Sequence, residues 1–210
     1  MPSSYTPLGV ELMVTGEQAG LWGDKTNTNL NILSQIVGGY NSQAVNGTGD
    51  TPLNVSDGAT GATVANRIIE LTGTITGNIT VSIPLDVENF YIIKNSTSGA
   101  FTVEFQYTSG SGTSVTFSST DKGTKFVYAK ADDGTNPNIV DVFSEFSQIN
   151  LVNRNELRFQ DATGGQYVGL RAASTVGSSF TLNLPTADAS SSGQALVSDS
   201  SGNLSFADAG

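Results

Sequence analysis

Two neighbouring stretches, Ile69–Pro84 (IELTGTITGNITVSIP) and Phe90–Phe105 (FYIIKNSTSGAFTVEF), decide the fold class. Both are rich in β-branched and aromatic residues, and glycine, asparagine or proline interrupts them at short intervals. This composition is typical of β-strands separated by turns. Val103 and Phe105 alternate with Thr102 and Glu104, as expected of a strand with one buried face. The two stretches therefore predict a β domain.

Strand signals of the same kind continue on both sides of these stretches. Short strands are expected at Arg67–Leu71, Ile79–Ile83, Phe90–Lys94, Phe101–Tyr107, Ser114–Phe117, Lys125–Ala129 and Ile139–Phe143. Short strands at regular intervals, joined by glycine-containing turns, favour a compact sandwich or barrel. We therefore expect an antiparallel β-sandwich-like domain over residues 66–146.

The residues that follow, 147–210, predict strands that are more widely spaced. They are expected at Glu156–Phe159, Tyr167–Leu170, Phe180–Leu184, Gln194–Val197 and Leu204–Phe206, with turns at Asp161–Gly165 and Asp199–Asn203. Hydrophobic residues make up only 37% of the chain, fewer than an ordinary globular domain carries. So thin an apolar supply, spread over many short strands along the whole chain, suggests that burial is completed by other subunits.

Upstream of the β domain, residues 41–65 are rich in glycine, serine, threonine, asparagine and aspartate. They predict a linker, or a long surface loop with one short strand at Leu53–Val55. A domain boundary is expected within this segment.

The stretch Thr15–Tyr40 carries the only convincing helix signal. Asp24 is a candidate N-cap, and Gly38 and Gly39 can end the helix. Leu30, Leu33 and Val37 form one apolar stripe, with Ile32 and Ile36 in a second stripe beside it. A helix this short must pack against something. The first stripe fits either a three-fold seam between helices or packing on a strand of its own chain.

The N-terminal arm and the single tryptophan complete the front of the chain. Residues 5–14 alternate, which predicts a strand that either adds to another protein or pairs within its own domain. Trp22 is either an interface anchor or a core residue. Residues 1–40 are thus expected to form a docking unit, with an interface made by Leu8, Val10, Leu12, Val14, Trp22, Leu30, Leu33 and Val37.

Three pieces of the sequence resemble bacteriophage tail-fibre and fibre-like virion proteins. The run from Thr15, TGEQAGLWGDKTNTNL, resembles the N-terminal attachment segment of such proteins, especially those of marine phages. The two opening stretches are similar to a β domain of the same proteins. The segments NELRFQDATGGQYVGLRA, FTLNLP and SGQALVSDSSGNLSF, within residues 155–206, resemble their shaft-type module.

The resemblance implies a mainly β homotrimer with an elongated, intertwined β shaft, made in the host bacterial cytoplasm and located in the virion. Its front end would attach to a tail adaptor or nozzle protein, and a more distal region would meet a host-surface receptor. Fibres of this kind usually continue into a tip, whereas this sequence stops at Asp208-Ala209-Gly210. The chain is therefore either a short fibre-like protein or the base of a longer one.

Charge and composition disfavour several other classes of function. The net charge of −10 argues against nucleic acid and anionic membrane surfaces as partners. The sequence has no histidine and no cysteine, which removes Ser–His and Cys–His nucleophiles and ordinary zinc sites. The start lacks the features of a secretory signal, and no apolar run is long enough to span a bilayer. No cofactor is expected.

Carboxylates are the remaining candidates for chemistry, and a glycosidase would need two of them across a groove. The candidates are Asp86, Glu88, Glu104, Asp132, Asp133, Asp141 and Glu145, and their spacing singles out no pair. The run Asp132–Asn138 is rich in oxygen ligands, but a hairpin turn explains it better than calcium does. A non-enzymatic fibre is the favoured interpretation. The alternatives are a carbohydrate-binding or depolymerising tailspike, and a capsid head fibre or decoration protein.

Overall fold

The computed structural model describes residues 3–161 and 165–208, and it is mainly β. The chain divides into two compact units, residues 1–146 and 147–210. This division falls where the sequence predicts the shaft-type module to begin. Part of the turn expected at Asp161–Gly165 lies outside the described residues.

The first unit begins with a small hairpin and a helix. Strand β1 (Ser4–Tyr5) pairs antiparallel with β2 (Glu11–Leu12), and α1 (Trp22–Gly38) follows. The position before the helix is Leu21, which makes no side-chain cap, so the prediction that Asp24 is the N-cap is wrong. Asp24 lies inside the first turn, where its negative charge interacts favourably with the positive end of the helix dipole. The helix ends as expected, and the Gly39 N–H donates to the carbonyl of Gln35.

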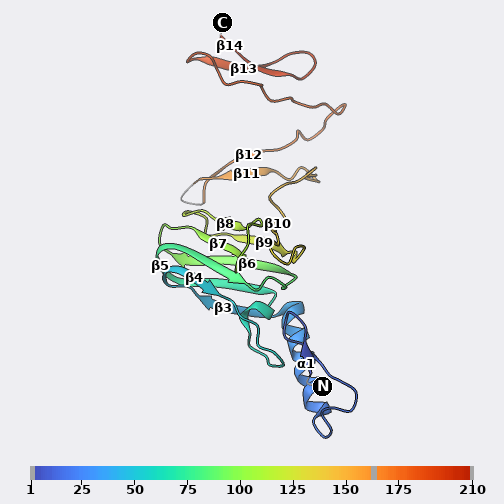
Figure 1. The fold of residues 1–210 in the computed structure, drawn as a ribbon. Coiled ribbons are helices and arrows are strands. Elements are labelled where there is room, and N and C mark those ends of the chain that lie inside the picture. Colours follow the sequence, from blue (N-terminus) through green and yellow to red (C-terminus); the bar gives the residue numbers. More distant parts are fainter. Residues whose placement is uncertain (1–2, 162–164, 209–210) are drawn as a thin grey trace. The chain divides into compact units, whose positions relative to one another are not determined.

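Five strands then form the centre of the unit (Figure 1): β3 (Tyr40–Ala44), β4 (Gly47–Pro52), β5 (Ile68–Ile83), β6 (Asn89–Ser98) and β7 (Val103–Tyr107). The long strand β5 pairs in parallel with β3 and β6 along its first half, and with β4 and β7 along its second half. The chain therefore makes three successive passes, and each pass contributes a strand to both halves of a nearly closed sheet. This is the arrangement of a short parallel solenoid.

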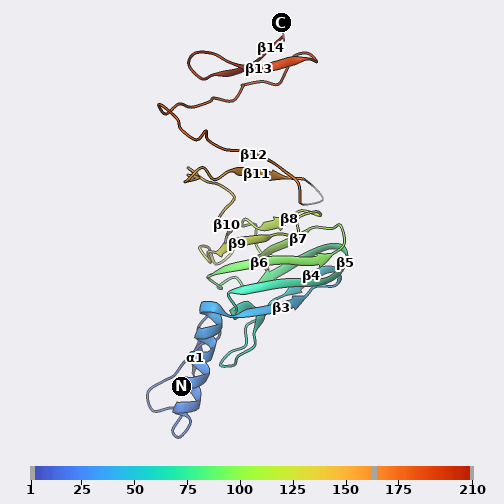
Figure 2. The same ribbon diagram turned by 180° about the vertical axis from the view of Figure 1, so that it is seen from behind.

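Antiparallel strands complete the two halves (Figure 2). Strand β8 (Val115–Phe117) pairs with β7, β9 (Thr124–Ala129) pairs with β6, and β10 (Ile139–Asp141) pairs with β9. The expected all-antiparallel sandwich is therefore wrong, because the central pairings are parallel. The physical reason lies in the glycine-containing segments. Gly73 and Gly99 have positive φ angles and sit where the chain passes from one half of the sheet to the other, not in hairpin turns.

The linker predicted for residues 41–65 is also wrong. This segment contains most of β3, all of β4 and a 3-10 turn, η1 (Thr63–Ala65), and the two strands pair with β5. Its polar side chains bond laterally to β5, as when the Ser82 hydroxyl donates to Asp50 at 2.9 Å. Val45 and Leu53 are buried in the core. Polar composition therefore marks the first pass of the solenoid and does not mark a flexible connection.

The core of the first unit lies between the two halves of the sheet. Alternate residues of β5 and β7 are buried, including Ile69, Val81 and Phe105. Tyr91 packs edge-on against Phe105 and donates its hydroxyl to the Val64 carbonyl at 2.9 Å. Aliphatic and aromatic burial within one chain therefore stabilises this unit.

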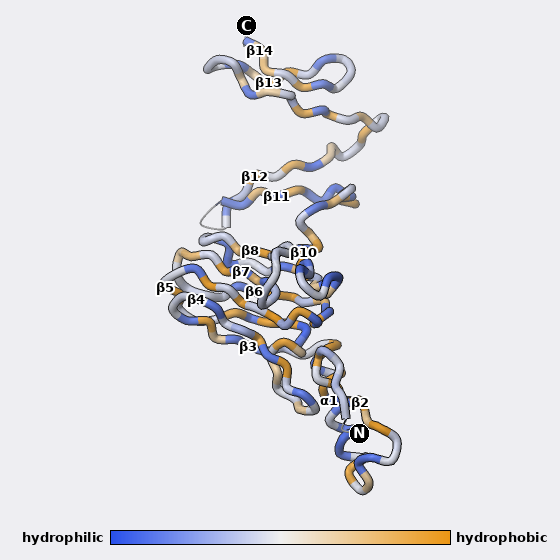
Figure 3. The backbone as a smooth tube through the Cα atoms, in the orientation of Figure 1, coloured by the Kyte–Doolittle hydropathy of each residue, from blue (hydrophilic) through white to orange (hydrophobic). Residues whose placement is uncertain are grey.

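The second unit contains two small antiparallel ribbons. Strand β11 (Leu157–Gln160) pairs with β12 (Tyr167–Leu170), and β13 (Gln194–Ser198) pairs with β14 (Leu204–Asp208). The strand expected at Phe180–Leu184 is not formed as a regular strand. One residue of this segment, Asn183, makes an isolated parallel bridge with Asn203. Figure 3 shows apolar and polar positions alternating along this unit. None of its described residues is buried.

Candidate interaction surfaces

Helix α1 presents two different faces. Ile32 and Ile36 face the chain itself, and Ile32 is only 1% exposed. Leu30, Leu33 and Val37 lie on the other side and are between 45% and 74% exposed. They line an open groove that ends at Gly38 and Gly39. Packing of this stripe on its own chain is therefore wrong, and the three side chains remain available to another molecule.

The N-terminal arm is fastened to the helix by polar contacts. The Asn29 side chain accepts from the Glu11 N–H and donates to the Glu11 carbonyl, both at 2.9 Å. The Glu11 carboxylate accepts from Gln18 and forms a 3.0 Å ion pair with Lys25. The bond from Lys25 is the main reason that the pKa of Glu11 is lowered, and the same bond raises the pKa of Lys25. The arm thus pairs within its own chain.

These contacts change which residues of the arm are accessible. Glu11 is buried, Leu12 is exposed, and Leu8, Val10 and Val14 are partly buried. The alternation of residues 5–14 predicts the reverse for Glu11 and Leu12. The difference arises because Asn29 and Lys25 hold Glu11 against the helix, a contact that no strand periodicity can reveal.

Trp22 lies at the first turn of α1, at the end of the helix away from the sheet (Figure 1). Its side chain is 63% exposed, and its neighbour Leu21 is exposed as well. The alternative in which Trp22 is a core residue of this chain is therefore wrong. An exposed tryptophan beside an exposed leucine offers a large apolar contact area at the tip of the unit.

The β11–β12 ribbon has one apolar face that nothing in this chain covers. The register pairs Leu157 with Leu170 and Phe159 with Val168, so the four side chains share a face. They are between 46% and 70% exposed. On the other face the Arg158 guanidinium lies 4.2 Å from the centre of the Tyr167 ring. The ribbon therefore has a polar face with internal contacts and an apolar face without them.

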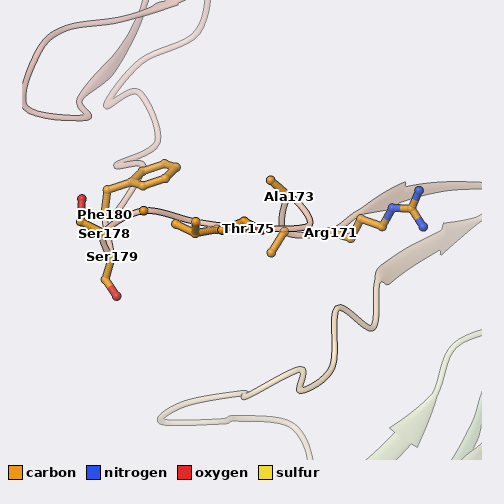
Figure 4. A pocket seen from close by; sticks show the side chains of 9 residues that line it. Arg171, Ala173, Thr175, Ser178, Ser179 and Phe180 are labelled. Atoms are coloured by element: carbon orange, nitrogen blue, oxygen red, sulfur yellow. The ribbon is translucent and has the colours of Figure 1, made fainter.

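The segment that follows β12 is extended and walls a hollow of about 750 Å³. Figure 4 shows Arg171 and Phe180 at opposite ends of this wall, with Thr175 between them. A single continuous stretch, residues 171–180, supplies the lining, so a small molecule bound there would meet protein on one side only. The hollow resembles an uncovered surface more than a ligand pocket.

The acidic candidates serve mainly as hydrogen-bond acceptors. Glu88 accepts from Tyr128 at 2.7 Å, Glu104 from Ser114 at 2.5 Å, and Asp141 pairs with Lys125 at 3.0 Å. Bonds from Lys130 and Asn138 hold the pKa of Asp132 far below its usual range. A general acid in a glycosidase needs a raised pKa, so the shift at Asp132 has the wrong sign for that role. Among the residues that the structure describes, Asp86 and Glu145 accept no side-chain hydrogen bond and form no ion pair.

The Asp132–Asn138 run connects the antiparallel strands β9 and β10, as the hairpin-turn interpretation predicts. Asp133 accepts from the N–H groups of Thr135 and Asn136, which lowers its pKa. Both carboxylates thus shape the turn. Within residues 3–161 and 165–208, no three acidic side chains gather as a metal site would require.

Sequence reasoning missed the apolar residues on the outer face of the sheet. Ile68 and Ile92 point away from the core, while the adjacent Ile69 and Ile93 are fully buried. The signal was present in the sequence, because paired isoleucines in a strand place apolar side chains on both faces. Phe143 and Phe146 add two exposed rings near the end of the first unit.

In comparisons with known proteins, no family model, no curated protein and no solved structure matches this chain. Among the described residues, α1 is too short and too polar to cross a lipid bilayer.

Proposed function

We propose that this chain is a non-enzymatic structural protein of a phage virion, a trimeric tail fibre or the base of one. One observation carries the proposal. In residues 147–208 the structure describes paired strands whose apolar faces are uncovered, and none of the described residues there is buried. Ordered strands of this kind need partner strands from other copies, because an isolated two-stranded ribbon is marginal in water.

The assignment to a virion rests on the resemblance of the three sequence pieces to phage fibre proteins. The exposed tip of the first unit supports the attachment role given to residues 1–40. Trp22 and Leu21 are accessible there, and large aromatic side chains commonly anchor protein interfaces. In this proposal the tip binds a tail adaptor or nozzle protein. The strands of the second unit then transmit mechanical force to and from this attachment point.

Two measurements test the proposal. Native mass spectrometry of the full chain is expected to show a trimer, and a monomer at micromolar concentration would contradict it. In particles of the phage that encodes this chain, gold-labelled protein is expected at the tail. Label on the capsid would favour a head fibre or decoration protein instead.

A point variant separates attachment from assembly. Trp22→Ala is expected to leave the trimer intact and to reduce incorporation into particles, with Asn31→Ala, at another exposed position of α1, as the matched control. Equal incorporation of the two variants would remove Trp22 from the attachment role.

A further inference from the structure

An apolar row crosses the outer face of the sheet in the first unit. The strand register aligns Tyr40 of β3 with Ile68 of β5, Ile68 with Ile92 of β6, and Ile92 with Phe126 of β9. The residues that follow the last three in sequence are buried, so this row faces away from the core. Directly opposed residues on neighbouring strands lie close enough for their side chains to touch. The four residues therefore form one continuous line.

The line continues beyond β9. The ring of Phe143 meets Phe126 edge-on, with a centroid distance of 4.8 Å. Phe146 stacks on Phe143 at 5.8 Å, and both of these rings are about half exposed. Aromatic contacts thus extend the row to the end of the first unit.

The line also continues in the opposite direction, onto the helix. Val37 precedes Tyr40 by three residues in the sequence, and α1 leads through Gly39 into β3 (Figure 2). The exposed helix stripe and the sheet row therefore follow one another directly along the chain. Together we call them the apolar seam, which consists of Leu30, Leu33, Val37, Tyr40, Ile68, Ile92, Phe126 and Phe143.

Two charges in the row beside the strand part of the seam pair with each other within the chain. The next row across the same strands contains Glu70 and Lys94, which form a 3.0 Å ion pair. Glu70 also accepts from the hydroxyls of Tyr40 at 2.5 Å and Ser96 at 2.6 Å. The whole chain carries a net charge of −10, so identical copies repel one another over most of their surface. Where the Glu70–Lys94 pair flanks the seam, copies can meet with less repulsion between like charges.

We propose that the apolar seam is where copies of this chain meet in the first unit, so that each seam residue faces its own counterpart near a shared axis. The spacing of Leu30, Leu33 and Val37 is that of helices packed together in a coiled coil. A second copy offers the same sequence of surfaces, helix first and sheet row after it, and so matches the seam along its whole length. The inference rests on the self-association in the proposed function and specifies its contact line.

The sequence makes a direct test simple, because the chain contains no cysteine. Val37→Cys places a single thiol on the helix part of the seam and Phe143→Cys places one at its far end, both at exposed positions. Asn31→Cys on the helix and Thr116→Cys on β8 are matched controls at exposed positions outside the seam. Under mild oxidation, the two seam variants are expected to form covalent dimers about tenfold or more faster than the controls, because assembly holds identical thiols together.

The possible outcomes separate this inference from the proposed function. A trimer by native mass spectrometry, with seam thiols that link no faster than the controls, overturns the seam and leaves the fibre proposal standing. Rapid linking at Val37 without linking at Phe143 also overturns it, because a continuous seam requires both. A chain that stays monomeric overturns both proposals.

Discussion

At the scale of single residues, the Asn29 side chain holds the N-terminal arm to helix α1 with two hydrogen bonds. It satisfies both backbone polar groups of Glu11, which is buried. We expect Asn29→Ala to destabilise the arm by about 1–3 kcal/mol, because a buried N–H and C=O lose their partners. Hydrogen exchange of residues 3–17 measures the loss. Asn31→Ala, which truncates an exposed asparagine on the same helix, should leave the exchange unchanged.

The hydrogen bonds to Glu70 predict that the fold loses some stability in acid. Bonds donated by Ser96, Tyr40 and Lys94 lower the pKa of Glu70 from its ordinary 4.5 to about 2. A carboxylate whose pKa is lowered in the folded state stabilises it above the unfolded pKa, and the contribution is lost as the pH falls from about 4.5 to about 2. The melting temperature of Glu70→Gln should therefore lie below that of the natural chain at pH 7, and the difference should shrink towards pH 2.

Comparing Glu70→Gln with the natural chain isolates the contribution of Glu70 to the pH dependence of stability, because the other acidic groups are present in both. Glu145→Gln removes an exposed carboxylate and controls for the change in net charge. A difference between Glu70→Gln and the natural chain that stays constant from pH 7 to pH 2 would contradict the assignment.

At the scale of elements, β5 organises the first unit because it serves both halves of the sheet. Gly73 lies where β5 changes from the strands of one half of the sheet to those of the other half, and its φ angle is +110°. A Cβ at this position would come within 2.9 Å of the Val45 carbonyl oxygen. We expect Gly73→Ala to lower the free energy of unfolding by about 1–3 kcal/mol, from backbone strain and this clash. Urea unfolding followed by circular dichroism provides the measurement.

Gly134 supplies the matched control for that substitution. It has no neighbour within 4 Å of an added Cβ, so Gly134→Ala should change stability by no more than about 0.5 kcal/mol. Equal effects of the two substitutions would show that the bend of β5 does not depend on glycine.

The elements also show what sequence periodicity could and could not predict. The alternation of Val103 and Phe105 correctly predicted a strand, and the glycines after Val37 correctly predicted the helix end. The direction of pairing could not be predicted. A glycine between two strand-like runs is compatible with a hairpin turn or with a bend that continues the pass, and only long-range pairing such as Tyr40 with Ile68 decides between them.

At the scale of the whole molecule, burial within one chain separates the two units. The first unit buries Ile69, Val81 and Phe105 completely, whereas the second buries none of its described residues. The sparse apolar supply predicted strands left uncovered within one chain, but it did not distinguish the two units. The seam could not be predicted, since Phe126 and Tyr40 are far apart in the chain, and only the strand register places them in one row.

If the second unit is ordered by contacts between copies, its protection from hydrogen exchange must depend on protein concentration. At concentrations where the trimer predominates, the fraction of free chain falls with the two-thirds power of the total chain concentration. Amide protection in β11–β14 should then rise about fivefold for each tenfold increase in total concentration. Amides of β5 and β6 should stay protected throughout, because one chain already buries the side chains of Ile69 and Ile93. Exchange with mass-spectrometric detection over a dilution series, alongside native mass spectrometry, provides the comparison. Strands β11–β14 that remain protected in a chain shown to be monomeric would mean that the second unit folds alone, and self-association would lose its physical basis.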